Sequence, residues 1–230
     1  MAMTFKVFSA LLSYPTVELQ RAAGELRDAL LGEAMLSASA IRGIEKLIGE
    51  IAEGDIFDLQ ERYVLLFDRT RSLSLHLFEH VHGESRDRGQ AMIDLAGIYA
   101  KNGLAISATE LPDFLPLFLE FLSIRPVAEA RALIGETSHI IVALGERLTK
   151  RGSAYASVFI ALTEVALTAP QEALIQALGA EPDVDPDDLA ALDAAWQDEP
   201  VTFGPEALGS CKEGLIARIR AGSRPAARSL

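Results

Sequence analysis

The chain has 230 residues, and its 33 acidic and 21 basic side chains leave a formal net charge of -12. DNA or RNA would be repelled by this charge, so we expect no nucleic-acid partner, whereas a basic peptide would be attracted. The single cysteine, Cys211, excludes an intrachain disulfide and any zinc site that needs two thiolates from one chain. These features favour a reducing cytoplasmic location.

The N-terminal segment predicts a first helix rather than a targeting sequence. Residues 1–15, MAMTFKVFSALLSYP, contain an apolar run with neither a preceding basic region nor a small-residue cleavage pattern. The longest uncharged apolar stretch covers residues 152–163 and ends at Glu164, well short of the roughly 20 residues that span a bilayer. We therefore expect neither a signal peptide nor a membrane segment.

Apolar residues recur at helical spacing along most of the chain, and period-two alternation is nearly absent. The clearest stripes are Phe5, Phe8, Leu11 and Leu12, then Ile41, Ile44, Leu47, Ile48 and Ile51, then Ile56, Leu59, Tyr63, Leu66 and Phe67. Gly54 and Gly103 stand where helices should end, and Pro126 stands near the start of a long helix that runs to about Arg151. The pattern predicts an all-α fold of nine to eleven helices without a sheet.

The composition changes after Gly179. Residues 181–199 contain eight acidic and no basic side chains, whereas residues 200–230 contain five basic and two acidic ones. Few apolar residues and many like charges do not offset the entropy of ordering a chain. We predict a globular helical domain over residues 1–178 and an acidic, then basic, partly disordered tail over 179–230, in which Trp196 docks onto an apolar surface.

Three of the four histidines fall in residues 76–89, HLFEHVHGESRDRG. On a helix over residues 75–82, His76 and His80 would share a face, as a two-histidine metal pair requires, while His82 would lie about 120° away. The simpler interpretation is that the histidines are hydrogen-bonded at a helix surface or line a groove. A metal-dependent helical enzyme that uses His76, His80 and a carboxylate is the alternative.

Residues 110–123, ELPDFLPLFLEFLS, predict a second distinctive helix. Asp113 is placed as its N-cap, with Pro116 in the first turn, where a missing amide hydrogen costs little. The apolar residues Phe114, Leu115, Leu117, Phe118, Leu119, Phe121 and Leu122 surround the helix almost completely, as in a buried core helix. Alternatively, one edge of it floors a groove beside the helix over 75–82, into which a client helix lays an apolar face.

These two stretches carry a family resemblance. Residues 63–95, YVLLFDRTRSLSLHLFEHVHGESRDRGQAMIDL, together with 110–123, resemble the NarJ-type nitrate reductase assembly chaperones of the TorD/DmsD family, and the likeness extends over about residues 1–170. The tail with WQDEPVTFG is also similar. The resemblance implies an all-helical chaperone that is not an enzyme and holds no tightly bound cofactor. It also implies binding to the N-terminus of the nitrate reductase α subunit until the molybdenum cofactor is inserted, with cofactor delivery proteins as further partners. A regulatory protein with some other helical partner remains a rival interpretation.

The wider family has an E-x-P-D-H motif, which Glu110, Leu111, Pro112 and Asp113 match, with Phe114 in place of the histidine. By this correspondence Glu110 and Asp113 become candidates for holding basic or amide groups of a client peptide, and helix capping is their alternative role. The complete set of candidate client-binding residues is His76, Glu79, His80, His82, Arg86, Glu110, Asp113, Phe114, Leu117, Phe118 and Phe121.

Overall fold

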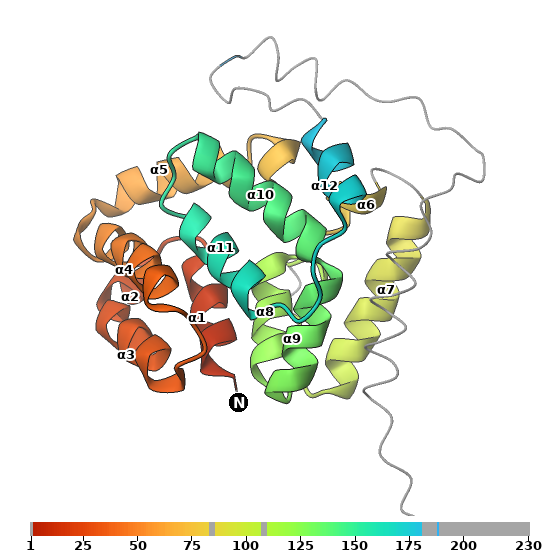
Figure 1. Ribbon diagram of the computed structural model, residues 1–230, viewed down its shortest axis with the longest axis horizontal. Coiled ribbons are helices and arrows are strands. Elements are labelled where there is room, and N and C mark those ends of the chain that lie inside the picture. Colours follow the sequence, from red (N-terminus) through yellow and green to blue (C-terminus); the bar gives the residue numbers. More distant parts are fainter. Residues whose placement is uncertain (1, 83–85, 107–109, 181–187, 189–230) are drawn as a thin grey trace, which may run out of the picture.

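The computed structural model describes residues 2–82, 86–106, 110–180 and 188, which form twelve α-helices and one short 3-10 helix (Figure 1). The side chains of residues 82, 86 and 87 lie outside this description, as do Cys211, Trp196 and almost all of the predicted tail. An isolated bridge between His76 and Phe114 is the only β pairing among the described residues. The all-α prediction is confirmed, and the helix count exceeds the predicted range because several helices are very short.

Most of the helices follow one another with short connections, and the longest connection lies between α7 and α8. In chain order they are α1 (Met3–Leu11), α2 (Val17–Arg21), α3 (Ala23–Glu33), α4 (Ala38–Glu53), α5 (Ile56–Phe67), the 3-10 helix η1 (Arg71–Leu73), α6 (Glu79–His82), α7 (Arg86–Lys101), α8 (Leu115–Ser123), α9 (Val127–Glu136), α10 (Ser138–Lys150), α11 (Ala156–Val165) and α12 (Glu172–Gly179). Helix α1 packs against α8 and α3, α4 packs against α11, and α10 packs against α11 and α12. Helices α2 to α5 lie toward one end of the long axis in Figure 1 and α7 toward the other, with α1 beside α8 between them.

Helix α8 lies in the core, as its nearly uniform apolar composition predicts. Leu115, Phe118, Leu119, Phe121 and Leu122 are each 0% exposed. Ser9 of α1 donates a hydrogen bond to the carbonyl oxygen of Pro116, which ties the two packed helices together. Because Phe118 and Phe121 have no exposed surface, neither can contact a docked segment in this conformation.

Local capping explains the corner between α4 and α5. Asp55 caps α5 by accepting hydrogen bonds from the backbone N–H groups of Phe57 and Asp58. Gly54 ends α4 as the sequence predicts, and a Cβ atom there would lie 2.7 Å from the carbonyl oxygen of Glu50. A side chain at position 54 would therefore force the backbone to shift where α4 passes into α5.

Three predicted helix boundaries are wrong. The long helix expected over 126–151 is divided at Thr137, whose side-chain hydroxyl donates to the carbonyl oxygen of Ile134 and so ends α9. The helix expected over 75–82 is only the short α6, because Leu75 to Phe78 pair with the chain before α8. Helix α8 begins at Leu115 rather than beside an Asp113 cap.

None of the helices in the described ranges is both long enough and apolar enough to cross a membrane. The predicted domain boundary at residue 178 stays a prediction, since the residues beyond 180 are described only at position 188.

Candidate functional site

Asp113 is the centre of the first site. Its side chain is 0% exposed, and its Oδ2 atom accepts a hydrogen bond of 3.0 Å from the backbone N–H of Phe78. Its Oδ1 atom lies 3.3 Å from Nδ1 of His76. The predicted N-cap role of Asp113 is therefore wrong: the carboxylate serves a segment 35 residues earlier in the chain. A buried carboxylate is tolerated because these donors replace its lost hydration.

Backbone hydrogen bonds join the same two segments. The N–H of Leu77 donates to the carbonyl oxygen of Asp113 at 3.0 Å, and the N–H of Leu115 donates to that of Leu75 at 2.8 Å. These bonds flank the antiparallel bridge between His76 and Phe114. We call residues 75–78 and 113–115 the bridge region. The groove predicted between a 75–82 helix and the α8 helix is absent from it, because the two segments are directly paired there.

His76 and Phe114 form the accessible part of the bridge region. The His76 side chain is 28% exposed, and its ring centroid lies 5.3 Å from that of the partly buried Phe114. Burial alone would lower the pKa of His76, but the hydrogen bond to Asp113 and the charge of that carboxylate outweigh it and raise the pKa. The site thus favours a positively charged imidazole beside an aromatic ring.

The remaining polar groups fix the chain on the inner side of the bridge region. His80 Nε2 lies 2.8 Å from the carbonyl oxygen of Ser74, and burial lowers the pKa of His80. Arg147 on α10 is buried and donates to the carbonyl oxygens of Ser72 and Leu178 at 2.6 and 2.5 Å. His80 and Arg147 thus satisfy the carbonyl oxygens of Ser74 and Ser72 beside η1, and Arg147 also ties α10 to the end of α12 at Leu178.

The geometry assumed for a two-histidine metal pair is not found. His76 lies on the extended segment and His80 on α6, so the two residues do not share a helix face. His80 is instead engaged with Ser74 and His76 with Asp113. Across the described ranges, no group of three or more His, Cys, Asp and Glu side chains is arranged to hold a metal ion.

The other predicted residues are distributed around the bridge region. Glu79 accepts a hydrogen bond of 3.1 Å from Arg88 of α7, Glu110 is exposed, and Leu117 is partly buried. Leu111, which was not among the predicted client-binding residues, is 46% exposed. It immediately precedes Pro112 and Asp113, which accept hydrogen bonds from Tyr99 and Phe78. The side chains of His82 and Arg86 lie outside the described residues.

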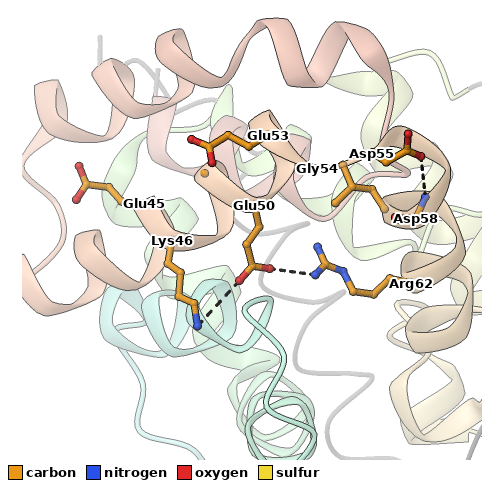
Figure 2. A pocket seen from close by; sticks show the side chains of 10 residues that line it. Glu45, Lys46, Glu50, Glu53, Gly54, Asp55, Asp58 and Arg62 are labelled. Atoms are coloured by element: carbon orange, nitrogen blue, oxygen red, sulfur yellow. Dashed lines mark hydrogen bonds and ion pairs between the residues drawn. The ribbon is translucent and has the colours of Figure 1, made fainter.

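A second site, absent from the predicted set, lies between α4 and α5. It is a pocket of about 630 Å³ lined by Glu45, Lys46, Gly49, Glu50, Glu53, Gly54, Asp55, Asp58, Leu59 and Arg62 (Figure 2). We call these residues the acidic pocket. Its two cations both approach Glu50, Arg62 at 3.0 Å and Lys46 at 4.0 Å. The sequence contained a pattern that indicates this pocket. Positions 45, 49 and 53 before Gly54, and positions 55, 58 and 62 after it, recur at helical spacing, so each set of side chains lies on one face of its helix.

Both sites lie in one all-helical fold, the first around the buried Asp113 and the second at the surface between α4 and α5. The family model described as "Nitrate reductase delta subunit" matches residues 18–161, and the chain belongs to this family.

Named relatives agree with this assignment. The chain is 40% identical over 197 residues to "Nitrate reductase molybdenum cofactor assembly chaperone NarJ" of Escherichia coli K12, covering 86% of this chain and 83% of that protein. It is 42% identical over 150 residues to "Probable nitrate reductase molybdenum cofactor assembly chaperone NarW" of the same strain, with 64% of each chain covered. It is 31% identical over 182 residues to the probable NarJ chaperone of Bacillus subtilis 168, covering 76% of this chain and 96% of that one.

Proposed function

We propose that the protein is a maturation chaperone of respiratory nitrate reductase that acts in the cytoplasm and is not itself an enzyme. In this proposal it binds the N-terminal segment of the catalytic α subunit and keeps that subunit competent for molybdenum cofactor insertion and assembly. The observation that carries the proposal is the 40% identity over 86% of the chain to a protein named as a nitrate reductase molybdenum cofactor assembly chaperone.

The bridge region is the surface we propose for the client segment. It presents an imidazole whose pKa is raised, after the opposing effect of burial, by Asp113, and this imidazole lies beside the Phe114 ring. The exposed Leu111 and the partly buried Leu117 add apolar contacts close by in the chain. Glu79 and Glu110 supply carboxylates that would attract basic residues of a client.

The expected affinity is moderate. Covering two or three apolar side chains stabilises a complex by about 1.5 to 3 kcal/mol each, and association and ordering costs subtract several kcal/mol from that sum. These apolar contacts alone would therefore bind weakly, and further contacts are needed to reach a dissociation constant in the micromolar range, about -8 kcal/mol. A chaperone that must release its client needs binding of this moderate strength.

A direct test is titration of the full chain with a fluorescent peptide from the N-terminus of the α subunit. We expect saturable binding to the unmodified protein and affinity about tenfold lower for Phe114→Ala, because one apolar contact of about 1.4 kcal/mol is lost. Ile160→Ala is the matched control, since Ile160 is an exposed apolar residue of another helix, α11, and 55% of it is accessible.

The two possible failures have different meanings. Absence of saturable binding to the unmodified chain would refute the proposed client segment. Saturable binding that Phe114→Ala leaves unchanged would keep the client and reject the bridge region as its binding surface.

A further inference from the structure

Helix α7 is covered by the rest of the domain on one face only. Its buried face consists of four residues at helical spacing, Ala91, Leu95, Ile98 and Tyr99. On the other face Gly89, Ile93 and Gly97 are exposed, and 67% of the Ile93 surface is accessible. None of the closely packed helix pairs in the described ranges includes α7, which lies toward one end of the molecule in Figure 1. With one packed face and two interior glycines, α7 is less stable as a helix than the core helices.

The C-terminal end of α7 is anchored by several contacts. Tyr99 donates a hydrogen bond of 2.9 Å to the carbonyl oxygen of Pro112, and its ring centroid lies 5.1 Å from that of Phe121 on α8. Arg125, which follows α8, donates a hydrogen bond to the side-chain oxygen of Asn102. Residues 99–102 therefore form a fixed pivot for the helix.

The N-terminal part of α7 is linked to α6 by an ion pair. Arg88 Nη2 lies 3.1 Å from Oε1 of Glu79, and 21% and 27% of the two side chains are accessible. An ion pair that water reaches contributes little to stability, so it opens at small cost. Glu79 directly follows the bridge region at Phe78, and Pro112 directly precedes it at Asp113. Helix α7 thus lies across this end of the bridge region, anchored at one end and latched at the other.

We propose that α7 is a hinged cover of the bridge region, which turns about residues 99–102 when the Arg88–Glu79 ion pair opens. Turning uncovers the buried Phe78 and Leu95 to apolar side chains of the client segment. Glu79 then exchanges Arg88 for a basic residue of the client. This inference rests on the proposed function, because it uses the same client.

Charge and area both favour this occupant. The net charge of -12 and the carboxylate of Glu79 attract a segment that carries a cation, while Phe78 and Leu95, which are 3% and 0% exposed, offer apolar area only after α7 has moved. The accessible contacts of the closed bridge region bind weakly, as argued above. The surface under α7 supplies the further contacts that a micromolar complex needs.

Amide hydrogen exchange of the full chain without client tests the hinge. We expect residues 91–98 to exchange faster than residues 118–122 of α8, because a helix of this length frays once it loses its packing. Arg88→Gln should raise the exchange rate of residues 91–98 about threefold, since it removes one partly exposed ion pair. Arg27→Gln is the matched control: it removes the ion pair of Arg27 with Glu45 at 2.8 Å and should leave α7 unchanged.

Titration with the fluorescent client peptide tests the cover. Arg88→Gln should bind the peptide about threefold more tightly than the unmodified chain, because a larger fraction of the protein is open. The variant Glu79→Cys, Arg88→Cys, made in the Cys211→Ser chain, allows a flexible bismaleimide to tie α7 to α6. The tied protein should bind about tenfold more weakly than the same variant with both thiols alkylated, which carries the same substitutions without the tie.

The hinged cover is rejected by equal exchange rates in residues 91–98 and 118–122, or by equal client affinity of the tied and alkylated proteins. Exchange in α7 that slows as protein concentration rises would assign the uncovered face to a second copy and would also overturn the proposal. Absence of client binding to every form would refute the proposed function and the occupant of the opened face. In that case the exchange rates would still decide whether α7 opens.

Discussion

The bridge region and the acidic pocket use the same kind of side chain in opposite environments. In the bridge region, Asp113 is completely buried, and its carboxylate accepts hydrogen bonds from the backbone N–H of Phe78 and from the ring of His76. This carboxylate therefore stabilises the fold. In the acidic pocket, Glu53 and Asp58 are exposed and screened by water and salt. The buried carboxylate of Asp113 thus stabilises one chain conformation, whereas the exposed carboxylates of Glu53 and Asp58 are accessible to a binding partner.

The largest effect is expected from Asp113→Ala. This change leaves the buried N–H of Phe78 without its acceptor and removes the partner of His76, so we expect a loss of about 3 kcal/mol in the free energy of unfolding. Asp113→Asn should cost less, because an amide oxygen can still accept from Phe78. Urea denaturation followed by circular dichroism measures both variants. A loss below about 1 kcal/mol for Asp113→Ala would show that the bridge region does not depend on its buried carboxylate.

A smaller, pH-dependent effect is expected from His76→Gln. Asp113 raises the pKa of His76 against the lowering effect of burial, so the folded-state pKa lies above the unfolded value of about 6.5. The resulting stabilisation is complete below the unfolded pKa and is lost as pH rises through the folded pKa. His76→Gln should therefore cost more stability at pH 5.5, about 1 kcal/mol, than at pH 8.5.

The quantity to measure is the difference in stability between the unmodified protein and His76→Gln at each pH, because other histidines change stability with pH in the opposite direction. Burial lowers the pKa values of His80 and His139, and the nearby His80 lowers that of His139 further. These two residues lose stabilisation as pH falls through their folded pKa values. Denaturation midpoints of both proteins at each pH isolate the contribution of His76. A cost of substitution that is equal at the two pH values would contradict the assigned ion pair.

The all-helical fold could be predicted because it depends on local patterns. Ile44, Leu47, Ile48 and Ile51 recur at helical spacing and form the buried face of α4. Apolar residues on nearly all sides of α8 likewise predicted a core helix, and Phe118 and Phe121 are buried there. Helical periodicity acts over three or four neighbouring residues, so one sequence is enough to detect it.

The role of Asp113 could not be predicted, because it depends on a contact across 35 residues. An aspartate before an apolar helix with an early proline has the local pattern of an N-cap. Whether it caps its own helix or serves another segment depends on which distant amides lack a partner. For the same reason Leu75 to Phe78 looked helical, although pairing with residues 113–115 holds them in a bridge and turn before α6.

The smallest effect is expected in the acidic pocket, from Glu50→Gln. Glu50 pairs with Arg62 and Lys46, but about a third or more of each of the three side chains is exposed. Exposed ion pairs contribute about 0 to 1 kcal/mol, so we expect a loss of about 0.5 kcal/mol at low salt that becomes undetectable near 1 M salt. Asp113→Asn in the same salt series is the control, since its buried partners are not screened and its cost should remain. A loss from Glu50→Gln that matches that of Asp113→Asn and persists at high salt would mean that the pocket, like the bridge region, is part of the structural framework.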